Sequence, residues 1–458
     1  MIQQQYCYTS ISCARPANAK MAASRMNTNH SIEASTTDPG NDDRRQRGAG
    51  RLKDSGRIVF LTPVPPMKSG TADFGLAFLQ GLQPLLHGLP VVVAADMKCL
   101  DGGEVQPIHD YSVIDYLEYI PEPSDTVFVS VGNNPFHSFC LHFLRRPKVV
   151  RKIVSILHDA QIFMHVEVLC RTQGYGFNDD HLRNILTDEF SHCASVFLEQ
   201  CRLGKLPDLF FYTTAAQAMV MRYSSSIWVH SHFAAAKLLL EHASPAHLPP
   251  IRVIHLPGGE DLRPSQRQPL RAVTEDFMVG VFGWVNPMKR VCEIIRAFSA
   301  WLRTLPASEQ AKVRLVVVGK LADPTYYDPV SVAGEMGIKD KVTFFGYTDL
   351  QTFETLLQQC SLLFNLRFPS AGETSGTLQR ARDLGIPVAV SAYAAFHEEP
   401  ADYKCSILPD QEHQDIMAVL DECWQVWRAF GSTRTLSKSN AFASSKTDFR
   451  DAFMAEFA

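Results

Sequence analysis

The chain has 458 residues, which is too long for one typical core, because domains usually contain about 100–200 residues. Hydrophobic residues make up 46% and charged residues 20%, an ordinary globular balance that excludes a wholly disordered or fibrous chain. The formal net charge of −4 argues against nucleic acid as the main partner. We therefore expect two globular domains with flanking segments.

The 11 cysteines include no C-x-x-C pair and no matching histidine spacing. A disulfide framework or a structural zinc site is therefore not expected, and the cysteines are typical of a reduced, cytoplasmic protein. No apolar run approaches the roughly 18–20 residues that a membrane span needs.

Residues 1–56 are rich in Ser, Thr, Asn and charge and lack apolar periodicity, so we predict that they are disordered. They contain no apolar core of a secretory signal, and Met21 or Met26 are alternative start residues.

The first predicted domain, 57–258, contains short runs rich in Val and Ile that alternate with helical patterns. Such runs are typical of a parallel sheet covered on both faces. A mainly helical stretch, 179–221, is longer than a usual crossover. The predicted strands are 57–65, 89–96, 125–135, 152–159, 226–231 and 251–257.

The second predicted domain, 276–409, follows a seam rich in Pro, Gly and Gln at 257–275 and repeats the same alternation. A C-terminal helical segment, 410–458, completes the chain. We predict an α/β fold of two doubly wound, Rossmann-like domains facing across a cleft, with ligands beyond the carboxyl ends of the strands. The predicted strands are 277–287, 313–320, 341–347, 360–366 and 386–391.

The most informative motif is NLRFPSAGETSG, which follows the predicted strand 360–366. A turn with a lone carboxylate, Glu373, precedes small residues that open a predicted helix. The free amides and positive end of a helix N-terminus can hold pyrophosphate oxygens, and the carboxylate can accept hydrogen bonds from sugar hydroxyls. Ordinary capping of the helix is the alternative interpretation.

Four motifs in order, VGVFGWVNPMKR, RLVVVGK, DKVTFFGY and NLRFPSAGETSG, make the chain resemble the GT-B fold glycosyltransferases. Within that class the chain is similar to family 4, glycosyl transferases group 1, whose members are retaining enzymes. The similarity covers roughly residues 57–409. It implies a nucleotide-diphosphate sugar as donor substrate and no separate cofactor.

The resemblance also assigns roles in the second domain. It implies that Glu373 contacts the transferred sugar and that Lys289 and Arg290 stabilise charge on the leaving diphosphate. The alternative for the basic pair is a solvated helix start. Backbone amides for the diphosphate are assigned to Thr374, Ser375, Gly376 and Thr377.

The sequence departs from the family pattern at two places. The arginine that usually follows the glycine of the first motif is replaced by Trp284. The second glutamate, which usually binds ribose, corresponds to Arg380 and Ala381, so the ribose contact stays unassigned.

In the first domain the resemblance implies that Gly70 lies in a glycine-rich loop near the donor phosphate or the acceptor. Only glycine permits unusual backbone angles and close approach there. His158 matches a histidine near the sugar, and Asn133 and Asn134 are expected beside the acceptor. The alternatives are a bare turn glycine and a structural histidine.

Metal ligation is not indicated, because no Asp-x-Asp turn follows a predicted strand. The expected partners are a nucleotide sugar donor and a saccharide or lipid-linked acceptor, in surface polysaccharide or glycolipid assembly. The basic cluster 145–152 suggests peripheral contact with anionic lipid at the inner membrane surface, with an ordinary exposed basic face as the alternative.

Three functional hypotheses stay open at this point. A retaining hexosyltransferase is favoured, a nucleotide-sugar epimerase of the same architecture is the second, and a catalytically degenerate sugar-nucleotide-binding protein is the third. The residues specify neither the base nor the sugar of the donor.

Overall fold

The structure is a computed structural model that describes Leu52 and residues 56–67, 69–99, 108, 111–241, 248–254, 275–437 and 447–457. These residues all lie in one compact unit of the chain. The predicted disordered segment 1–56 lies outside the described residues except at Leu52 and Gly56. The predicted seam, 257–275, lies outside them except at its last residue.

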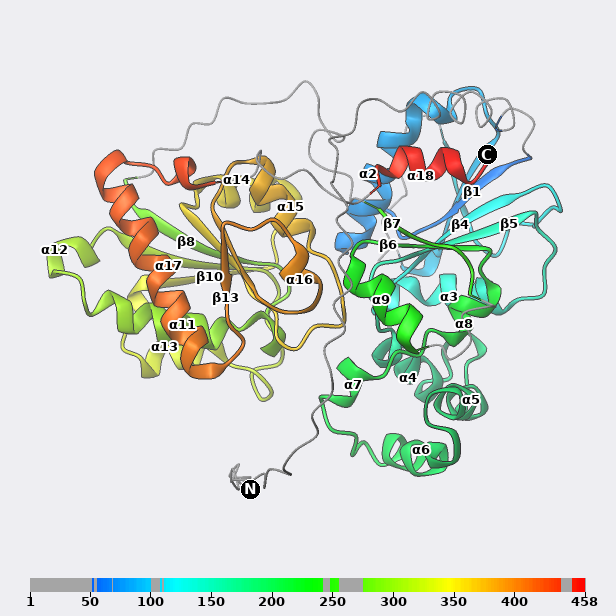
Figure 1. Ribbon diagram of the computed structural model, residues 1–458, viewed down its shortest axis with the longest axis horizontal. Helices are drawn as coiled ribbons and strands as arrows, with labels where there is room; N and C mark the ends of the chain where they lie inside the picture. The colour runs from blue at the N-terminus through cyan, green and yellow to red at the C-terminus, as the bar shows by residue number, and fades with distance from the viewer. Residues whose placement is uncertain are drawn as a thin grey trace, which may run out of the picture. The chain divides into compact units, whose positions relative to one another are not determined.

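Seven parallel strands of the described residues form the first sheet, in the order β3-β2-β1-β4-β5-β6-β7 (Figure 1). Strand β1 pairs with β2 on one side and β4 on the other, with Ile58 opposite Val91 and Thr126. The short strand β3 was not predicted, because its three residues are only half-buried and form no apolar run. The strands are β1 (Ile58–Leu61), β2 (Val91–Ala95), β3 (Val113–Asp115), β4 (Thr126–Val131), β5 (Lys152–Leu157), β6 (Ser226–Val229) and β7 (Ile251–Val253).

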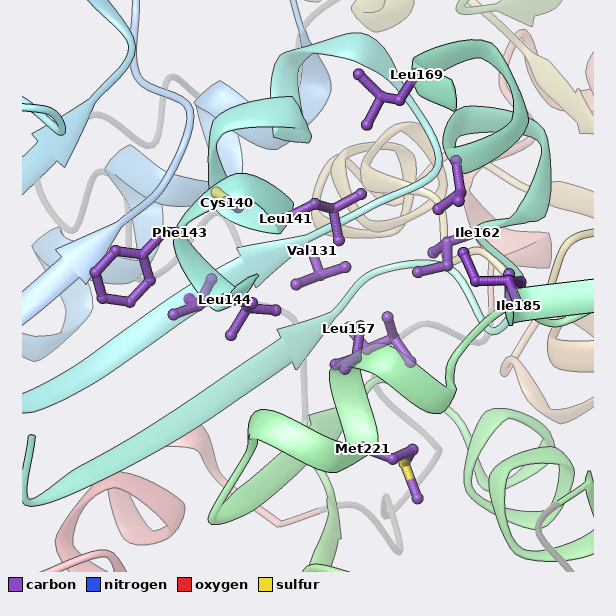
Figure 2. Close-up of a cluster of buried hydrophobic side chains, with 14 of the residues drawn as sticks. Val131, Cys140, Leu141, Phe143, Leu144, Leu157, Ile162, Leu169, Ile185 and Met221 are labelled. Carbon is purple, nitrogen blue, oxygen red and sulfur yellow. The ribbon is translucent and has the colours of Figure 1, made fainter. Parts of the chain in front are cut away.

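Alternate residues of each strand feed two separate cores on the two faces of this sheet, as the period of two in a strand requires. Phe60 and Phe128 face one side, where α2 (Gly70–Leu86) and α18 (Phe449–Ala455) pack. Val129 and Leu157 belong to the core on the other side, under α3 (Ser138–Arg145) and α4 (Phe163–Arg171). Figure 2 shows part of this second core, where side chains of the strands and of α3 come together.

The stretch predicted to be mainly helical, 179–221, is helical. It contains α5 (Asp179–Phe190), α6 (Ala194–Arg202), α7 (Phe210–Thr213) and the start of α8 (Ala218–Tyr223), with α9 (His232–Glu241) following β6.

The second sheet has six parallel strands among the described residues, in the order β10-β9-β8-β11-β12-β13 (Figure 1). The last strand was not predicted, because only one of its three residues is buried. The strands are β8 (Phe277–Phe282), β9 (Val313–Val318), β10 (Val342–Gly346), β11 (Leu362–Asn365), β12 (Val388–Ser391) and β13 (Tyr403–Cys405).

Helices cover both faces of the second sheet as well. Residues of α11, α13 and α17 share one core with Phe277, Val279 and Val281 of β8. Residues of α14, α15 and α16 share the other with Phe282. The predicted pair of doubly wound α/β domains is confirmed. These helices are α11 (Val291–Leu302), α12 (Ala307–Gln310), α13 (Pro329–Glu335), α14 (Leu350–Gln359), α15 (Gly376–Asp383), α16 (Ala394–Glu398) and α17 (Pro409–Phe430).

The two C-terminal helices join different cores. Helix α17 packs against α11 on the second sheet. Helix α18 instead places Phe449 and Phe453 against Phe78 and Phe128 of the first. Over the described ranges, none of the helices combines the length and the apolar character that crossing a membrane requires.

Candidate functional site

Lys289 lies over the turn that follows β8. The turn needs its glycine, because Gly283 has a φ of 96° and a Cβ there would come within 2.8 Å of the Lys289 Nζ. A short 3₁₀ helix, Pro287–Lys289, returns the lysine to the strand end, where its Nζ donates to the carbonyl of Phe282 at 2.7 Å. The lysine side chain is therefore buried at the carboxyl end of the sheet.

Glu373 is held in its turn by three groups. Its Oε2 accepts hydrogen bonds from the Ser370 hydroxyl and the Ala371 amide, both at 2.8 Å. Its Oε1 lies 3.3 Å from Nε of Arg367, the second residue after β11. The carboxylate is thus fixed in orientation while its side chain keeps 16% of its surface exposed.

The small residues after Glu373 begin helix α15 as predicted. Ser375 is the N-cap, and its hydroxyl accepts from the Leu378 amide at 3.3 Å. The same hydroxyl donates to Oδ1 of Asn365, whose buried Nδ2 has no hydrogen-bond partner among the described residues. Gly376, the first helical residue, is exposed. An N-terminus of this kind can offer free amides to an anion.

The electrostatics of this turn favour an anionic ligand. Burial pushes the pKa of Lys289 well below its usual range, and the charge of Arg367 lowers it further while Glu373 raises it. Burial also lowers the pKa of Arg367 to about 10. Two buried basic groups therefore share one nearby carboxylate, and an incoming anion would relieve the imbalance.

Arg290 does not share this arrangement, and the predicted basic pair needs correction. Its guanidinium binds the Glu412 carboxylate at 3.0 and 2.6 Å and lies 3.5 Å from Glu293. The reason is local: Arg290 adopts a left-handed backbone, with φ of 57°, where the chain enters α11. The structure brings Lys289 together with Arg367 instead.

His158 lies inside a cluster of histidines under the first sheet's carboxyl edge. Its Nε2 bonds the Ser130 hydroxyl at 2.7 Å and its Nδ1 bonds Nε2 of His230 at 3.1 Å. Phe74 packs edge-on against the ring at 4.6 Å. Burial, with His230 and His137 nearby, holds the pKa of His158 well below its usual value. Both ring nitrogens are occupied, so in this arrangement neither points to a ligand.

Asn133 and Asn134 act within their loop. The side-chain oxygen of Asn133 accepts from the backbone amide of His165 at 2.9 Å, and the backbone amide of Asn133 donates to Oδ2 of Asp159 at 2.6 Å. Asn134 caps a short 3₁₀ helix, accepting from the Phe136 amide at 3.1 Å. Both asparagines therefore form hydrogen bonds within the first domain, which hold their loop in place.

The argument made for Gly70 is wrong in one respect. Gly70 is the first residue of α2 and has no positive φ, and a Cβ there would meet nothing within 4 Å. Ser69 is the N-cap of this helix, and its hydroxyl accepts from the Thr71 amide. The position therefore does not require glycine for an unusual backbone angle.

The first domain reaches the Glu373 turn through residues that follow β5. The Gln161 amide donates to the carbonyl of Ala371 at 3.0 Å. Gly372, with φ of 78°, is packed so closely on Ala160 that a Cβ would overlap that residue. Arg380 of α15 lies 3.2 Å from Asp73 of α2. The charge of Glu373 acts on Lys289, and the residues of the first domain that contact the Glu373 turn are Ala160 and Gln161 rather than Gly70.

Two residues of this region were missed by sequence reasoning, Arg367 and Asp159. Arg367 directly follows the predicted strand 360–366, and Asp159 is the last residue of the predicted strand 152–159. The available signal was therefore their position at the carboxyl end of a strand. Burial, followed in order of size by the Asn133 bond that opposes it and by the charge of Glu373, leaves the pKa of Asp159 raised to about 7.

Comparisons with known proteins relate the second domain to a sequence family and the whole chain to a fold. Residues 263–423 match the family model of glycosyl transferases group 1. No curated protein matches the sequence significantly. The match covers the described second domain from β8 into α17, including the Lys289 and Glu373 turns.

Solved structures with the same fold include three at low sequence identity. A trehalose-6-phosphate structure from E. coli with UDP-2-fluoro glucose has a TM-score of 0.52 and 10% identity, covering 88% of this chain and 99% of that one. The α,α-trehalose 6-phosphate synthase of Burkholderia multivorans has a TM-score of 0.53 and 12% identity, covering 88% and 96%. Anabaena HepE with UDP and glucose has a TM-score of 0.50 and 15% identity, covering 87% and 98%. The fold is GT-B, and the family match supports a glycosyltransferase.

Proposed function

We propose that this chain is a retaining glycosyltransferase of family 4 that moves a hexose-type sugar from a nucleotide diphosphate sugar to a hydroxyl acceptor. The observation that carries the proposal is the pair of buried basic groups, Lys289 and Arg367, beside the fixed carboxylate of Glu373. A nucleotide diphosphate supplies the negative charge that this turn lacks, and its sugar supplies hydroxyls for Glu373.

In the proposed reaction the acceptor oxygen forms a bond to the anomeric carbon. The bond from that carbon to the β-phosphate oxygen breaks, and its electron pair stays on the diphosphate. The acceptor proton passes to the leaving diphosphate on the same face, which retains the anomeric configuration. Lys289 and the first amides of α15 stabilise charge where it develops. The retaining stereochemistry rests on the family resemblance.

Metal independence is part of the proposal. Cations fixed beside a leaving diphosphate can neutralise the developing charge, which is the role that a divalent metal takes in other phosphate chemistry. Lys289 is suited to that role because the fold holds its Nζ at the end of β8.

We further propose a saccharide or lipid-linked acceptor, with a cytoplasmic enzyme acting in surface polysaccharide or glycolipid assembly. Peripheral membrane contact would depend on few residues of the basic cluster. Lys148 donates to carbonyls at the end of α3, and Lys152 binds Glu456. Arg146 and Arg151 are the cluster residues left to face a lipid.

The test is incubation of the purified protein with a panel of UDP- and GDP-sugars, with and without EDTA. Hydrolysis or transfer that EDTA leaves unchanged supports the proposal. Formation of an epimer would support a nucleotide-sugar epimerase instead. Binding without turnover would support a catalytically degenerate sugar-nucleotide-binding protein. Arg380 favours this alternative, because it lies where the family's ribose-binding glutamate is expected. Its guanidinium pairs with Asp73 and Glu354.

A further inference from the structure

Arg367 is an unusual residue for its position. It lies between the end of β11 and the Glu373 turn, and only 7% of its surface is exposed. Arginine is rarely buried this deeply unless it is paired. Its Nε faces Glu373, one terminal nitrogen donates to the Leu366 carbonyl at 2.9 Å, and the guanidinium lies 5.6 Å from the Phe396 ring centre.

These contacts hold the guanidinium where it can act on two groups of the site, Glu373 and Lys289. On one side it orients the carboxylate expected to bind the sugar. On the other, its charge acts on Lys289, whose Nζ donates a hydrogen bond to the neutral carbonyl of Phe282. The buried Nδ2 of Asn365, two residues earlier, has no hydrogen-bond partner among the described residues and marks the same strand end as incomplete.

We propose that Arg367 is a positioning residue of the donor site, which fixes Glu373 for the sugar and, through its charge, reserves Lys289 for an incoming diphosphate. The inference rests on the proposed donor site. This chain carries Trp284 at the position where the family usually has an arginine, so Arg367 is a basic residue of the site that the family pattern does not name.

Binding of a diphosphate is then coupled to protonation. In the free protein, burial and then the charge of Arg367 lower the pKa of Lys289, while Glu373 opposes them. A ligand with at least two negative charges favours the ammonium form, so binding takes a proton from solvent. Removing Arg367 while Glu373 stays makes Lys289 easier to protonate in the free protein, so less proton is taken up on binding.

Glu373, from the same turn, acts on both Lys289 and Arg367, and its charge also acts on Asp159 and Tyr212 of the first domain. Burial raises the pKa of Asp159 to about 7, near the pH of the experiment. It must therefore be separated experimentally from Lys289.

The experiment is titration calorimetry of the full chain with UDP and with GDP at pH 8.5, in two buffers of different ionisation enthalpy. At this pH the terminal phosphate, with a pKa of about 6, is already ionised and contributes little proton exchange. The variants are Arg367→Gln, Arg367→Lys and Lys289→Met. Arg434→Gln is the matched control, because Arg434 is a largely buried arginine bonded to the Gln358 carbonyl, near the other end of β11.

We expect the wild type to take up a measurable fraction of one proton per nucleotide. Arg367→Gln should retain less than about half of that uptake and lower kcat for transfer roughly 10- to 100-fold, as loss of a supporting residue typically does. Arg367→Lys should restore part of both, and Lys289→Met should abolish the uptake. Asp159→Asn should leave the difference between wild type and Arg367→Gln in place.

The outcomes separate this inference from the proposed function. If the wild type binds neither UDP nor GDP, the donor site itself is refuted. If it binds one of them with the same proton uptake as Arg367→Gln, the role of Arg367 is refuted while the donor site stands. Loss of uptake in Arg434→Gln as well would also overturn it, because the effect would then follow from removing any buried arginine.

Discussion

The carboxylate of Glu456 lies 2.6 Å from the ammonium of Lys152, although 304 positions separate the two residues in the sequence. The other carboxylate oxygen accepts from Arg252 and Ser226, both at 2.9 Å, and from the Trp228 indole at 3.0 Å. The end of the chain is therefore tied to β5, β6 and β7 by a single acidic side chain.

Glu456→Gln should destabilise the protein by about 2–3 kcal/mol. Removing one member of a buried ion pair leaves the other charges uncompensated, and partial exposure of Lys152 and Arg252 moderates the cost. Urea unfolding followed by tryptophan fluorescence measures the change. Glu335→Gln, at an exposed position of α13, is the control and should have no effect. Equal stability of the two variants would contradict the assigned role of Glu456.

The Glu456 contribution should also depend on pH. Burial opposes ionisation, but the bonds from Lys152 and Trp228 outweigh it and lower the pKa of Glu456 below its ordinary 4.5. The stabilisation is therefore complete above pH 4.5 and is lost as the pH falls through the folded value. The wild type and Glu456→Gln should converge in stability in acid.

Lys289→Met should separate activity from stability. Methionine fills a similar volume without a charge to desolvate, so the melting temperature should stay the same or rise. Transfer should fall on the order of 100-fold or more, because a cation acting on the leaving group is removed. Differential scanning fluorimetry and a donor-hydrolysis assay measure the two effects. A variant that melts normally and keeps full transfer would remove Lys289 from the site.

Glu373→Gln should lower transfer while preserving the turn. The amide oxygen can still accept from Ser370 or Ala371, but it no longer carries the charge that faces Arg367. We expect a loss on the order of 100-fold in kcat/KM for the sugar donor, with a smaller change in binding of the free nucleotide. Ser370→Ala removes one hydrogen bond to Glu373, so its kcat/KM should lie between those of the wild type and Glu373→Gln. Full transfer by Glu373→Ala would eliminate the main site assignment.

The histidine cluster predicts a loss of stability below neutral pH. Burial lowers the pKa of His137 to about 4 and of His165 to about 3, so both are neutral in the folded protein. Their contribution is present above the ordinary 6.5 and is lost as the pH falls, by about 2 kcal/mol for His137 at pH 5. Asp159 acts in the opposite sense, because its pKa is raised.

Thermal midpoints between pH 5 and 8 test this expectation. His137→Gln, which does not gain a proton over that range, should show a flatter profile than the wild type. Asp159→Asn should show a steeper one. Parallel profiles for the three proteins would mean that this cluster does not control the acid response.

Sequence patterns predicted the two sheets well where strands are buried on both faces, because such strands read as continuous apolar runs. They missed β3 and β13, which are short and largely half-buried, so their burial leaves no such run. The Glu373 turn was predictable because the capping residues and the strand precede it locally. Arg367 and Asp159 were not, because their significance depends on burial and on neighbours distant in sequence.

The same limit explains Arg290. A pair of basic residues in one loop suggests one shared role, but the left-handed backbone at Arg290 turns its side chain toward Glu412, 122 positions away. Periodicity gives no information about such a partner.

The placement of α18 has a consequence for how the protein is made. Phe449 and Phe453 complete the core beneath α2 and β4, so the domain that is synthesised first cannot finish assembling until α18 has been synthesised too. A fragment that stops in the region between the domains would leave these aromatic partners missing. Dividing the protein into separately expressed halves should therefore require fusing α18 to the first half.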